Sequence, residues 1–369
     1  MLQNRVHFLW QDPGAVRGFR TGVSLHSHTM HSQECLSFLP RYLHHVPVLS
    51  QAARKYEQPR GSVDFARAYW TPPLAPAAAL RLEREQIAGL GLQPLVSLTD
   101  HDDIEAGAAL QSAAAGGEVP ISVEWTVPYA ESILHFGIQN LPQRESRQWM
   151  EVLVRHTATG VPEALPEILR QLSQIPEVLI VFNHPFWLEE GVEEAGHRRA
   201  MLRLLDECLE WIHAFELNGT RGWRENAAVC TLARAHGRPL VSGGDRHGTE
   251  PSACVNLTNA GSFAEFVSEI RQGNSTLLFM PQYREPMGLR VLETCWDILR
   301  PYPEYPGRER WTDRVFYRCS DGVARPISTW KDQIPWMLDA LTGVVQACAT
   351  TPLRAAMRLF LTEKGEILR

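Results

Sequence analysis

The chain has 369 residues, of which 44% are hydrophobic and 21% charged, and this composition excludes a mostly disordered protein. Its 36 basic and 42 acidic residues give a net charge of −6, which argues against bulk nucleic-acid binding. The apolar runs are too short to cross a bilayer, and the start of the sequence lacks the apolar region of a signal peptide. The seven cysteines include no Cys-x-x-Cys pair and are typical of free thiols. We therefore expect a cytoplasmic protein without a membrane partner.

Short apolar runs that end in polar or ionisable residues alternate with segments of helical periodicity. The apolar runs, which we expect to form strands, cover residues 22–28, 94–101, 120–124, 133–139, 178–184, 211–218 and 239–245. The helical segments cover residues 78–89, 103–115, 146–157, 162–172, 198–209 and 224–236. Continuous apolar runs suit strands that are buried on both faces. Their alternation with helices predicts an α/β fold, either a βα barrel or a doubly wound sheet.

The third and fourth apolar runs lie close together in the sequence. Ten residues separate Glu124 from His135, too few for a helical crossover between parallel strands. Either these runs form a hairpin or short loop, or one of them is not a barrel strand. We therefore predict a distorted, TIM-like (β/α)7 barrel rather than a regular eightfold one.

Two regions lie outside this pattern. Residues 36–80 carry six prolines and form a long insertion after the first strand, which is either a lid or a decorative loop. We expect the barrel to cover residues 1–283, with a C-terminal extension of helical or mixed structure over residues 284–369. A helix is expected at 336–347. The extension could cap the barrel or mediate homo-oligomer contacts, and the sequence does not choose between them.

Side chains of the kind that bind metals gather at the ends of the expected strands. They are His26, His28, His101, Glu124, His135, His184, Asp245 and His247. Because the carboxyl ends of barrel strands meet at one mouth, these residues can surround the same ions. Imidazole nitrogens and carboxylate oxygens suit zinc, manganese or iron.

The spacing of these residues supports a shared site. His26 and His28 lie on one strand face, as do Asp245 and His247. Glu124 stands between apolar residues, where a carboxylate is costly unless a cation or a donor meets it. Each residue alone has an ordinary structural explanation, such as a hydrogen-bonded core histidine. Their combination predicts a metal centre.

The order of these residues resembles that of the PHP (polymerase and histidinol phosphatase) domain. The family pattern consists of His-x-His-Thr-x-x-Ser, Thr-Asp-His, a lone glutamate, a histidine, His-Pro and Asp-x-His. In this chain the pattern matches, in the same order, residues 26–32, 99–101, 124, 135, 184–185 and 245–247. The resemblance covers residues 22 to about 250 and leaves out residues 36–80 and the C-terminal extension.

The resemblance implies two or three divalent metal ions at the mouth of a distorted (β/α)7 barrel. One ion would bind His26, His28, Glu124 and Asp245. A second ion would share Glu124 and add His135 and His184. A third would bind His101, His247 and one ligand just after the first motif. At that point the family has aspartate or histidine and this chain has Gln33 and Glu34, so that Glu34 is the candidate ligand.

Members of this family mostly hydrolyse phosphate esters, and the resemblance implies the same activity here. Asp245, His184 and Arg246 are the candidate catalytic residues. Arg246, Arg221 and Arg224 are candidates for binding phosphoryl oxygens, because a guanidinium offers a fork of donors. The expected partner is a small phosphorylated substrate or a nucleotide.

Two neighbours of the predicted ligands could orient them. Asn183 precedes His184, and Asp100 precedes His101. Because successive side chains of a strand alternate, Asp100 should point away from His101.

Two other functions remain open. An amidohydrolase-type barrel also begins with His-x-His and uses two metal ions, but it usually has a bridging lysine, which none of the expected strand ends carries. A non-catalytic metal-binding PHP scaffold is the other alternative, and the departure from the family pattern at Gln33 favours it weakly.

Overall fold

The computed structural model describes residues 3–37, 64–113, 119–189 and 191–329, together with residues 343 and 345. Over these ranges the chain is a mixed α/β protein with two compact units. The first unit contains residues 3–32 and 74–287, and the second contains residues 33–37, 64–73, 288–329, 343 and 345. The division predicted between residues 283 and 284 stays a prediction. Most of the 36–80 insertion and, apart from residues 343 and 345, the helix expected at 336–347 lie outside the described residues.

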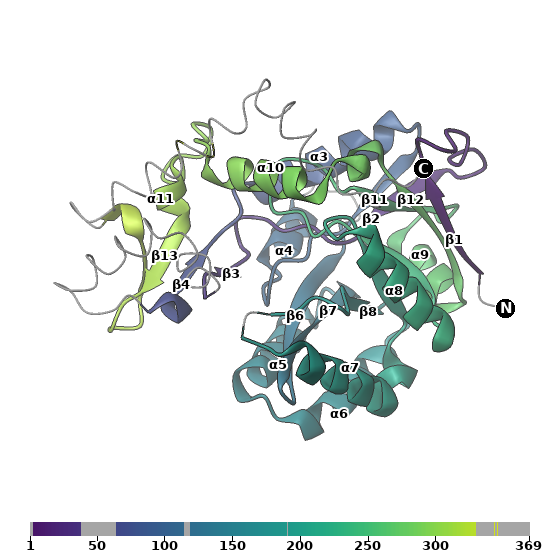
Figure 1. Ribbon diagram of the computed structural model, residues 1–369, viewed down its shortest axis with the longest axis horizontal. Helices are drawn as coiled ribbons and strands as arrows, with labels where there is room; N and C mark the ends of the chain where they lie inside the picture. Colours follow the sequence, from purple (N-terminus) through teal and green to yellow (C-terminus); the bar gives the residue numbers. More distant parts are fainter. Residues whose placement is uncertain are drawn as a thin grey trace. The chain divides into compact units, whose positions relative to one another are not determined.

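Two five-stranded sheets form the centre of the first unit (Figure 1). In pairing order, the first sheet consists of β1 (Gln3–Phe8), β12 (Asn274–Phe279), β11 (Cys254–Thr258), β2 (Thr21–Ser24) and β5 (Gln93–Val96). The second sheet consists of β10 (Leu240–Gly243), β9 (Ala214–Asn218), β8 (Leu179–Asn183), β7 (Ser132–Leu141) and β6 (Ile121–Tyr129). Every residue of β8 and β9 is buried, as expected of strands that are covered on both faces.

The strand directions explain the short spacing between Glu124 and His135. β6 and β7 form an antiparallel hairpin, and β7 also runs antiparallel to β8. The hairpin confirms one of the two alternatives raised by the sequence. β11 is antiparallel to both of its neighbours, whereas β2–β5, β1–β12, β8–β9 and β9–β10 are parallel.

The two sheets are joined at their edges, although the strand ladders of the described residues do not close into a barrel. Three isolated parallel bridges connect the sheets: Ser27–Arg246, Leu98–Ile121 and His101–Glu124. At the opposite edges, the Leu240 N–H donates to Asn4 Oδ1, and the Ser275 hydroxyl donates to the Leu240 carbonyl. The fold is therefore the expected α/β class, and the closed barrel is not confirmed.

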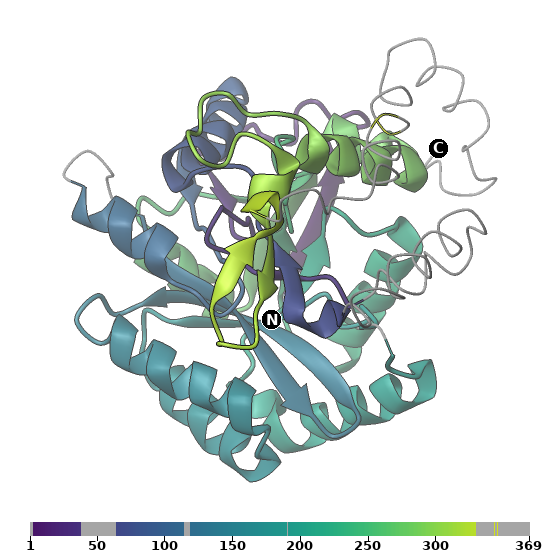
Figure 2. The ribbon, with the colours of Figure 1, turned by 90° about the vertical axis from the view of Figure 1, so that its left-hand side faces the viewer.

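Helices cover these sheets in the first unit. They are α3 (Pro76–Gly89), α4 (Glu105–Ser112), α5 (Ser146–Thr159), α6 (Leu165–Ser173), α7 (Glu194–Cys208), α8 (Trp223–Ala235) and α9 (Phe263–Arg271), with short 3₁₀ turns η2 (Pro162–Ala164), η3 (Leu209–Trp211) and η4 (Pro281–Arg284). α5, α7 and α6 contact β6, β7 and β8 respectively, on one side of the second sheet (Figures 1 and 2). α8 contacts β9, and α9 contacts β12. None of the described helices has both the length and the apolarity needed to cross a membrane.

Aromatic rings form the core between the second sheet and its helices. Phe136, Phe182 and Phe215 come from three neighbouring strands, and their successive ring centroids are 5.2 and 6.0 Å apart. All three side chains are fully buried, and each such burial contributes about 2–3 kcal/mol. Because side chains alternate along a strand, the residues next to these rings, such as His135 and Asn183, point to the opposite face of the sheet. The packing of these rings thereby directs His135 and Asn183 toward the opposite face.

The second unit contains a four-stranded antiparallel sheet. Its order is β14 (Ala324–Pro326), β13 (Val315–Arg318), β4 (Ala68–Trp70) and β3 (Glu34–Cys35). Its helical elements are α10 (Met287–Leu299), which begins in the first unit, α11 (Trp311–Arg314), and the 3₁₀ turns η1 (Phe65–Arg67) and η5 (Ile327–Thr329). The buried guanidinium of Arg314 donates to the carbonyls of Ile298, Arg300, Arg308 and Glu309, and so ties α10 to the loop before α11.

Candidate metal centre

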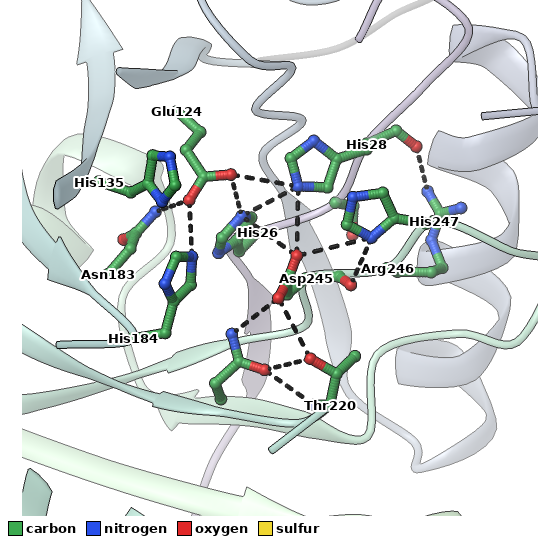
Figure 3. Close-up of polar contacts among 12 residues, drawn as sticks. His26, His28, Glu124, His135, Asn183, His184, Thr220, Asp245, Arg246 and His247 are labelled. Atoms are coloured by element: carbon green, nitrogen blue, oxygen red, sulfur yellow. Dashed lines mark hydrogen bonds and ion pairs between the residues drawn. The ribbon is translucent and has the colours of Figure 1, made fainter. Parts of the chain in front are cut away.

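Ligand-type side chains from several strands of the first unit converge on one site (Figure 3). Within the first unit they form four overlapping groups, and in each group the candidate ligand atoms lie within 4.8 Å of one another. The groups are His26, His28, Glu124 and Asp245; Glu124, His135 and His184; His28, His101 and His247; and His26, His184 and Glu216, a carboxylate that was not predicted as a ligand. The structure thus brings together eight of the nine residues predicted as metal ligands.

Glu34 is the ninth predicted ligand. It is the first residue of β3 and belongs to the second unit, so its role at a third ion stays a prediction. Gln33, which stands where the family pattern has a ligand, accepts a hydrogen bond of 2.8 Å from Arg318 within the same unit.

Glu124 occupies the centre of the site, and its two oxygens face different groups. Its Oε2 lies 2.8 Å from His26 Nε2 and 3.3 Å from His28 Nε2. Its Oε1 lies 2.9 Å from His184 Nε2. Asn183 donates to Oε1 over 3.0 Å and so restricts the rotation of the carboxylate, as expected of a residue that orients Glu124. Glu124 therefore has the placement of a ligand that bridges two ions.

The ring nitrogens that face away from the site are hydrogen-bonded. His26 Nδ1 lies 2.6 Å from Glu216 Oε1. His247 Nδ1 lies 3.0 Å from the carbonyl oxygen of Asp245, which can only accept, so that this nitrogen carries the proton. When Nδ1 holds the proton, the Nε2 lone pair is free to bind a cation. This donor set fits divalent transition metals.

Asp245 presents one oxygen to the site and keeps the other in a network of donors. Its Oδ1 lies 3.4 Å from His28 Nε2. Its Oδ2 accepts from Asn218 over 3.3 Å, from Thr220 over 3.2 Å and from Arg221 over 3.0 Å. Three donors on one oxygen hold the side chain in place, so that Oδ1 remains as the ligand atom.

The electrostatics of the buried cluster match this arrangement. Burial would raise the pKa of Glu124, but His26 and His101 hold it well below its usual range. Burial likewise opposes charge on Asp245, while His28, Arg221 and His247 hold its pKa well below the ordinary value. Burial lowers the pKa of His135 to about 3. At neutral pH the carboxylates are therefore charged and His135 is neutral, which are the forms that bind cations.

The pKa of His26 shifts upward, in the opposite direction to that of His135. Burial would lower its pKa, but Glu124 and Glu216 together raise it well above the usual value. In the metal-free protein this ring is thus a cation between two carboxylates. A metal ion bound at Nε2 would replace the proton there.

Two of the predicted ligands have strained backbones. His184 and Asp245 have positive φ angles of 25° and 47°, in a region that residues other than glycine seldom adopt. Such conformations cost on the order of 1–3 kcal/mol and persist where surrounding contacts hold them. The hydrogen bonds described above supply such contacts for Asp245.

The structure does not support the phosphate-binding role predicted for Arg246. Its guanidinium is buried and donates to Glu83 Oε1 over 2.9 Å, to the Gly248 carbonyl over 2.8 Å and to the His28 carbonyl over 3.3 Å. The Arg246 guanidinium therefore lies on the outer side of His28 and His247, away from Glu124 (Figure 3). Arg246 therefore holds the backbone around two ligands and does not face a substrate.

The other two predicted arginines differ in position. Arg221 lies over the ring of Trp187, with 3.7 Å from the guanidinium carbon to the ring centroid, and donates to Asp245. Trp187 is 39% exposed, so this pair lies at the rim of the site. Arg224, the second residue of α8, is exposed, and no contact ties it to the ligands in the described part of the chain. Asp100 accepts from the backbone and hydroxyl of Thr29, beside the ligand His28.

Sequence reasoning missed two buried carboxylates, Glu216 and Glu83. Glu216 contacts His26, and Glu83 pairs with Arg246. Glu216 stands in an apolar strand, as Glu124 does, so the same reasoning about an isolated carboxylate would have found it. Glu83 lies in a helix whose charged residues Arg81 and Glu85 are exposed, and no feature of the sequence separates it from them.

Comparison with known proteins leaves the family open. No protein-family model matches the sequence. No curated protein matches it at a significant level. Solved structures that resemble the chain include PsfC from Pseudomonas syringae, with 15% identity, a TM-score of 0.40 and coverage of 76% of this chain and 98% of that one.

Two further similar structures cover 54% of this chain and 92% of their own. One is an amidohydrolase from Chromobacterium violaceum with bound sulfate and no metal, at 16% identity and a TM-score of 0.36. The other is a candidate metal-dependent phosphoesterase from Bifidobacterium adolescentis, at 12% identity and a TM-score of 0.31. At these TM-scores the likeness carries no conclusion about function, which must come from the geometry of the site.

Proposed function

We propose that this chain is a metal-dependent hydrolase of phosphate esters with two divalent ions at the centre described above. One observation carries the proposal: the two oxygens of the buried Glu124 face two separate groups of histidines. Two metal ions that share a carboxylate are a common arrangement for the hydrolysis of phosphate esters. Zinc, manganese and iron all suit the mixture of imidazole and carboxylate ligands.

The residues of the chain would divide the work as follows. When bound, divalent ions act as Lewis acids and lower the pKa of water, which supplies a nucleophile near neutral pH. His184 and Asp245, both proposed as catalytic, would hold the ions that activate the water and bind the substrate. Arg221 lies at the rim, where its guanidinium can bind the oxygens of a phosphoryl group.

Three finer points belong to the same proposal. A third ion would bind His101 and His247, with Glu34 as a further ligand. The two sheets would form a distorted (β/α)7 barrel of the PHP type, since bridges and side-chain bonds join both pairs of edges. The substrate would be a small phosphorylated compound or a nucleotide in the cytoplasm.

A substrate panel tests the proposed activity. Protein loaded with zinc, manganese or iron is assayed on p-nitrophenyl phosphate, bis-p-nitrophenyl phosphate and an anilide. We expect turnover of at least one phosphate ester and none of the anilide. Glu124→Gln should lower kcat/KM at least ~100-fold, because the amide cannot bridge two cations.

Glu207→Gln is the matched control. The carboxylate of Glu207, a residue of α7, accepts hydrogen bonds from Tyr129 and Arg203. These contacts involve no predicted ligand, so this variant should keep its activity. Full phosphatase turnover in Glu124→Gln, or turnover of the anilide alone, would refute the proposal.

A further inference from the structure

Glu216 is a buried carboxylate behind the metal centre that has no assigned role. It is the third residue of β9, whose other members are Ala214, Phe215, Leu217 and Asn218. Its side chain is 1% exposed. An isolated charge at such a position costs several kcal/mol unless donors meet it, so its contacts show what holds it there.

Both oxygens of the Glu216 carboxylate accept hydrogen bonds, from three groups in all. Its Oε1 lies 2.6 Å from His26 Nδ1. Its Oε2 accepts from the backbone N–H of His184 over 2.9 Å and from Asn218 Nδ2 over 3.1 Å. One carboxylate thus reaches the ring of a ligand in the first proposed ion site and the backbone of a ligand in the second.

His26 lies between two carboxylates on opposite sides of its ring. Nε2 faces Glu124 at 2.8 Å, on the side of the proposed ions, and Nδ1 faces Glu216. Glu216 therefore contacts the nitrogen that is turned away from Glu124. This placement is that of a group that orients a ligand, as carboxylates behind metal-binding histidines commonly do.

We infer that Glu216 is a positioning residue for both ions of the proposed function. It keeps the proton of His26 on Nδ1, so that the Nε2 lone pair faces the ion. It also accepts a hydrogen bond from the backbone N–H of His184. This bond helps to keep His184 at its unfavourable φ of 25°.

The neighbouring strand leaves room for this carboxylate. A Cβ atom on Gly243 of β10 would lie 1.6 Å from Glu216 Oε1 and 2.1 Å from its carboxyl carbon. Any side chain at position 243 would therefore push Glu216 out of its place. The glycine at the end of β10 is explained by the space that Glu216 requires.

An amide cannot replace this carboxylate. All three partners are donors, whereas glutamine has only one accepting oxygen. If its NH₂ group faces His26, the ring must accept at Nδ1 and carry its proton on Nε2, which blocks the metal. If the NH₂ group faces the other way, it meets the N–H of His184 and the amide of Asn218.

The test compares Glu216→Gln with Glu207→Gln as a matched control for the loss of one carboxylate. Zinc affinity is measured by competition with a chelator, and the protonation of the histidine rings is measured by ¹⁵N NMR. We expect Glu216→Gln to weaken zinc binding ~10–100-fold and to lose the protonated Nδ1 signal of His26. Glu207→Gln should keep both properties.

A measurement on the wild-type protein covers the case in which Glu216→Gln does not fold. In the zinc-loaded wild type, His26 should carry its proton on Nδ1 and bind zinc through Nε2. Zinc bound at Nδ1, or wild-type zinc affinity in Glu216→Gln, would overturn the inference.

The outcome also separates this inference from the proposed function on which it rests. If the wild type binds zinc as described but hydrolyses no phosphate ester, the proposed function fails and the role of Glu216 stands. If the wild type hydrolyses phosphate esters and Glu216→Gln binds zinc normally, only the role of Glu216 fails. A wild-type protein that binds no metal overturns both.

Discussion

Arg246 stands between two predicted metal ligands in the sequence, yet its side chain stabilises the fold. It pairs with Glu83, which is fully buried and also accepts from Ser24, Ser27 and the backbone of Ser252. A buried ion pair adds little to stability, but the loss of one partner leaves a charge without compensation. Removing one partner should therefore cost more stability than removing both, and this difference can be measured.

Arg246→Met should lower the free energy of unfolding by about 3–5 kcal/mol, because Glu83 would remain buried as an unpaired anion. Urea denaturation of the metal-free protein measures the loss. The double variant Glu83→Gln/Arg246→Met should lose clearly less, since it removes both charges. Unchanged stability of Arg246→Met together with a raised KM for phosphate esters would instead restore the phosphate-binding role.

At the scale of single residues, the alternation of side chains along a strand predicts which of them share a face, but not which partner each one meets. Alternation placed His26 and His28 on one face, and both rings contact Glu124. Arg246 adjoins two predicted ligands in the sequence, but neighbours along a chain need not face the same site. The partner of Arg246 could not be predicted, because Glu83 comes from a helix 163 residues away.

His213 connects two strands of the second sheet. It precedes β9, its Nδ1 accepts the N–H of Ile180 in β8 over 2.9 Å, and its own N–H donates to the Ile180 carbonyl over 2.9 Å. Burial, together with Arg271 and Arg238, lowers the pKa of its ring to about 3 from 6.5. Between about pH 3 and pH 6.5 the ring is therefore neutral in the folded protein but protonated in the unfolded chain.

This difference predicts the direction of a pH effect. Below pH 6.5 the unfolded state binds more protons at His213 than the folded state does, so the stability that the neutral ring contributes is lost as the pH falls toward 3. Between pH 7 and pH 5 the loss should be about 1–2 kcal/mol. His213→Asn keeps an acceptor for Ile180 and cannot titrate, so its stability should fall less over the same range. Equal pH dependence of the two proteins in urea denaturation would contradict this account of β8 and β9.

The elements themselves were predictable where the sequence repeats a local pattern. The apolar runs gave the strands that end in ligands, and the spacing between Glu124 and His135 left the β6–β7 hairpin as one of two alternatives. The antiparallel direction of β11 was not predicted, since its segment follows the last apolar run that was interpreted as a strand. The contacts between the β1–β12 edge and β10 come from the side chains of Asn4 and Ser275, whose partner Leu240 lies more than 30 residues away in the sequence.

At the scale of the whole molecule, the first unit concentrates charge in its interior. Glu124, Asp245 and Glu216 are all buried, and the histidines around them come from strands spread over 222 residues, from 26 to 247. His26 and Arg221 offset part of this negative charge, and metal ions bound at the site would neutralise the rest. Ions that bind only the folded chain would stabilise it in proportion to the logarithm of their concentration. Metal binding by the wild-type protein is therefore the central prediction.

Elemental analysis of the purified wild-type chain, after growth with manganese, iron and zinc and removal of loosely bound metal by gel filtration, is the most direct test. Our account predicts about two transition-metal ions per chain, held by the groups that meet at Glu124. Protein that contains no such ion, and takes up none when zinc or manganese is added, would contradict it.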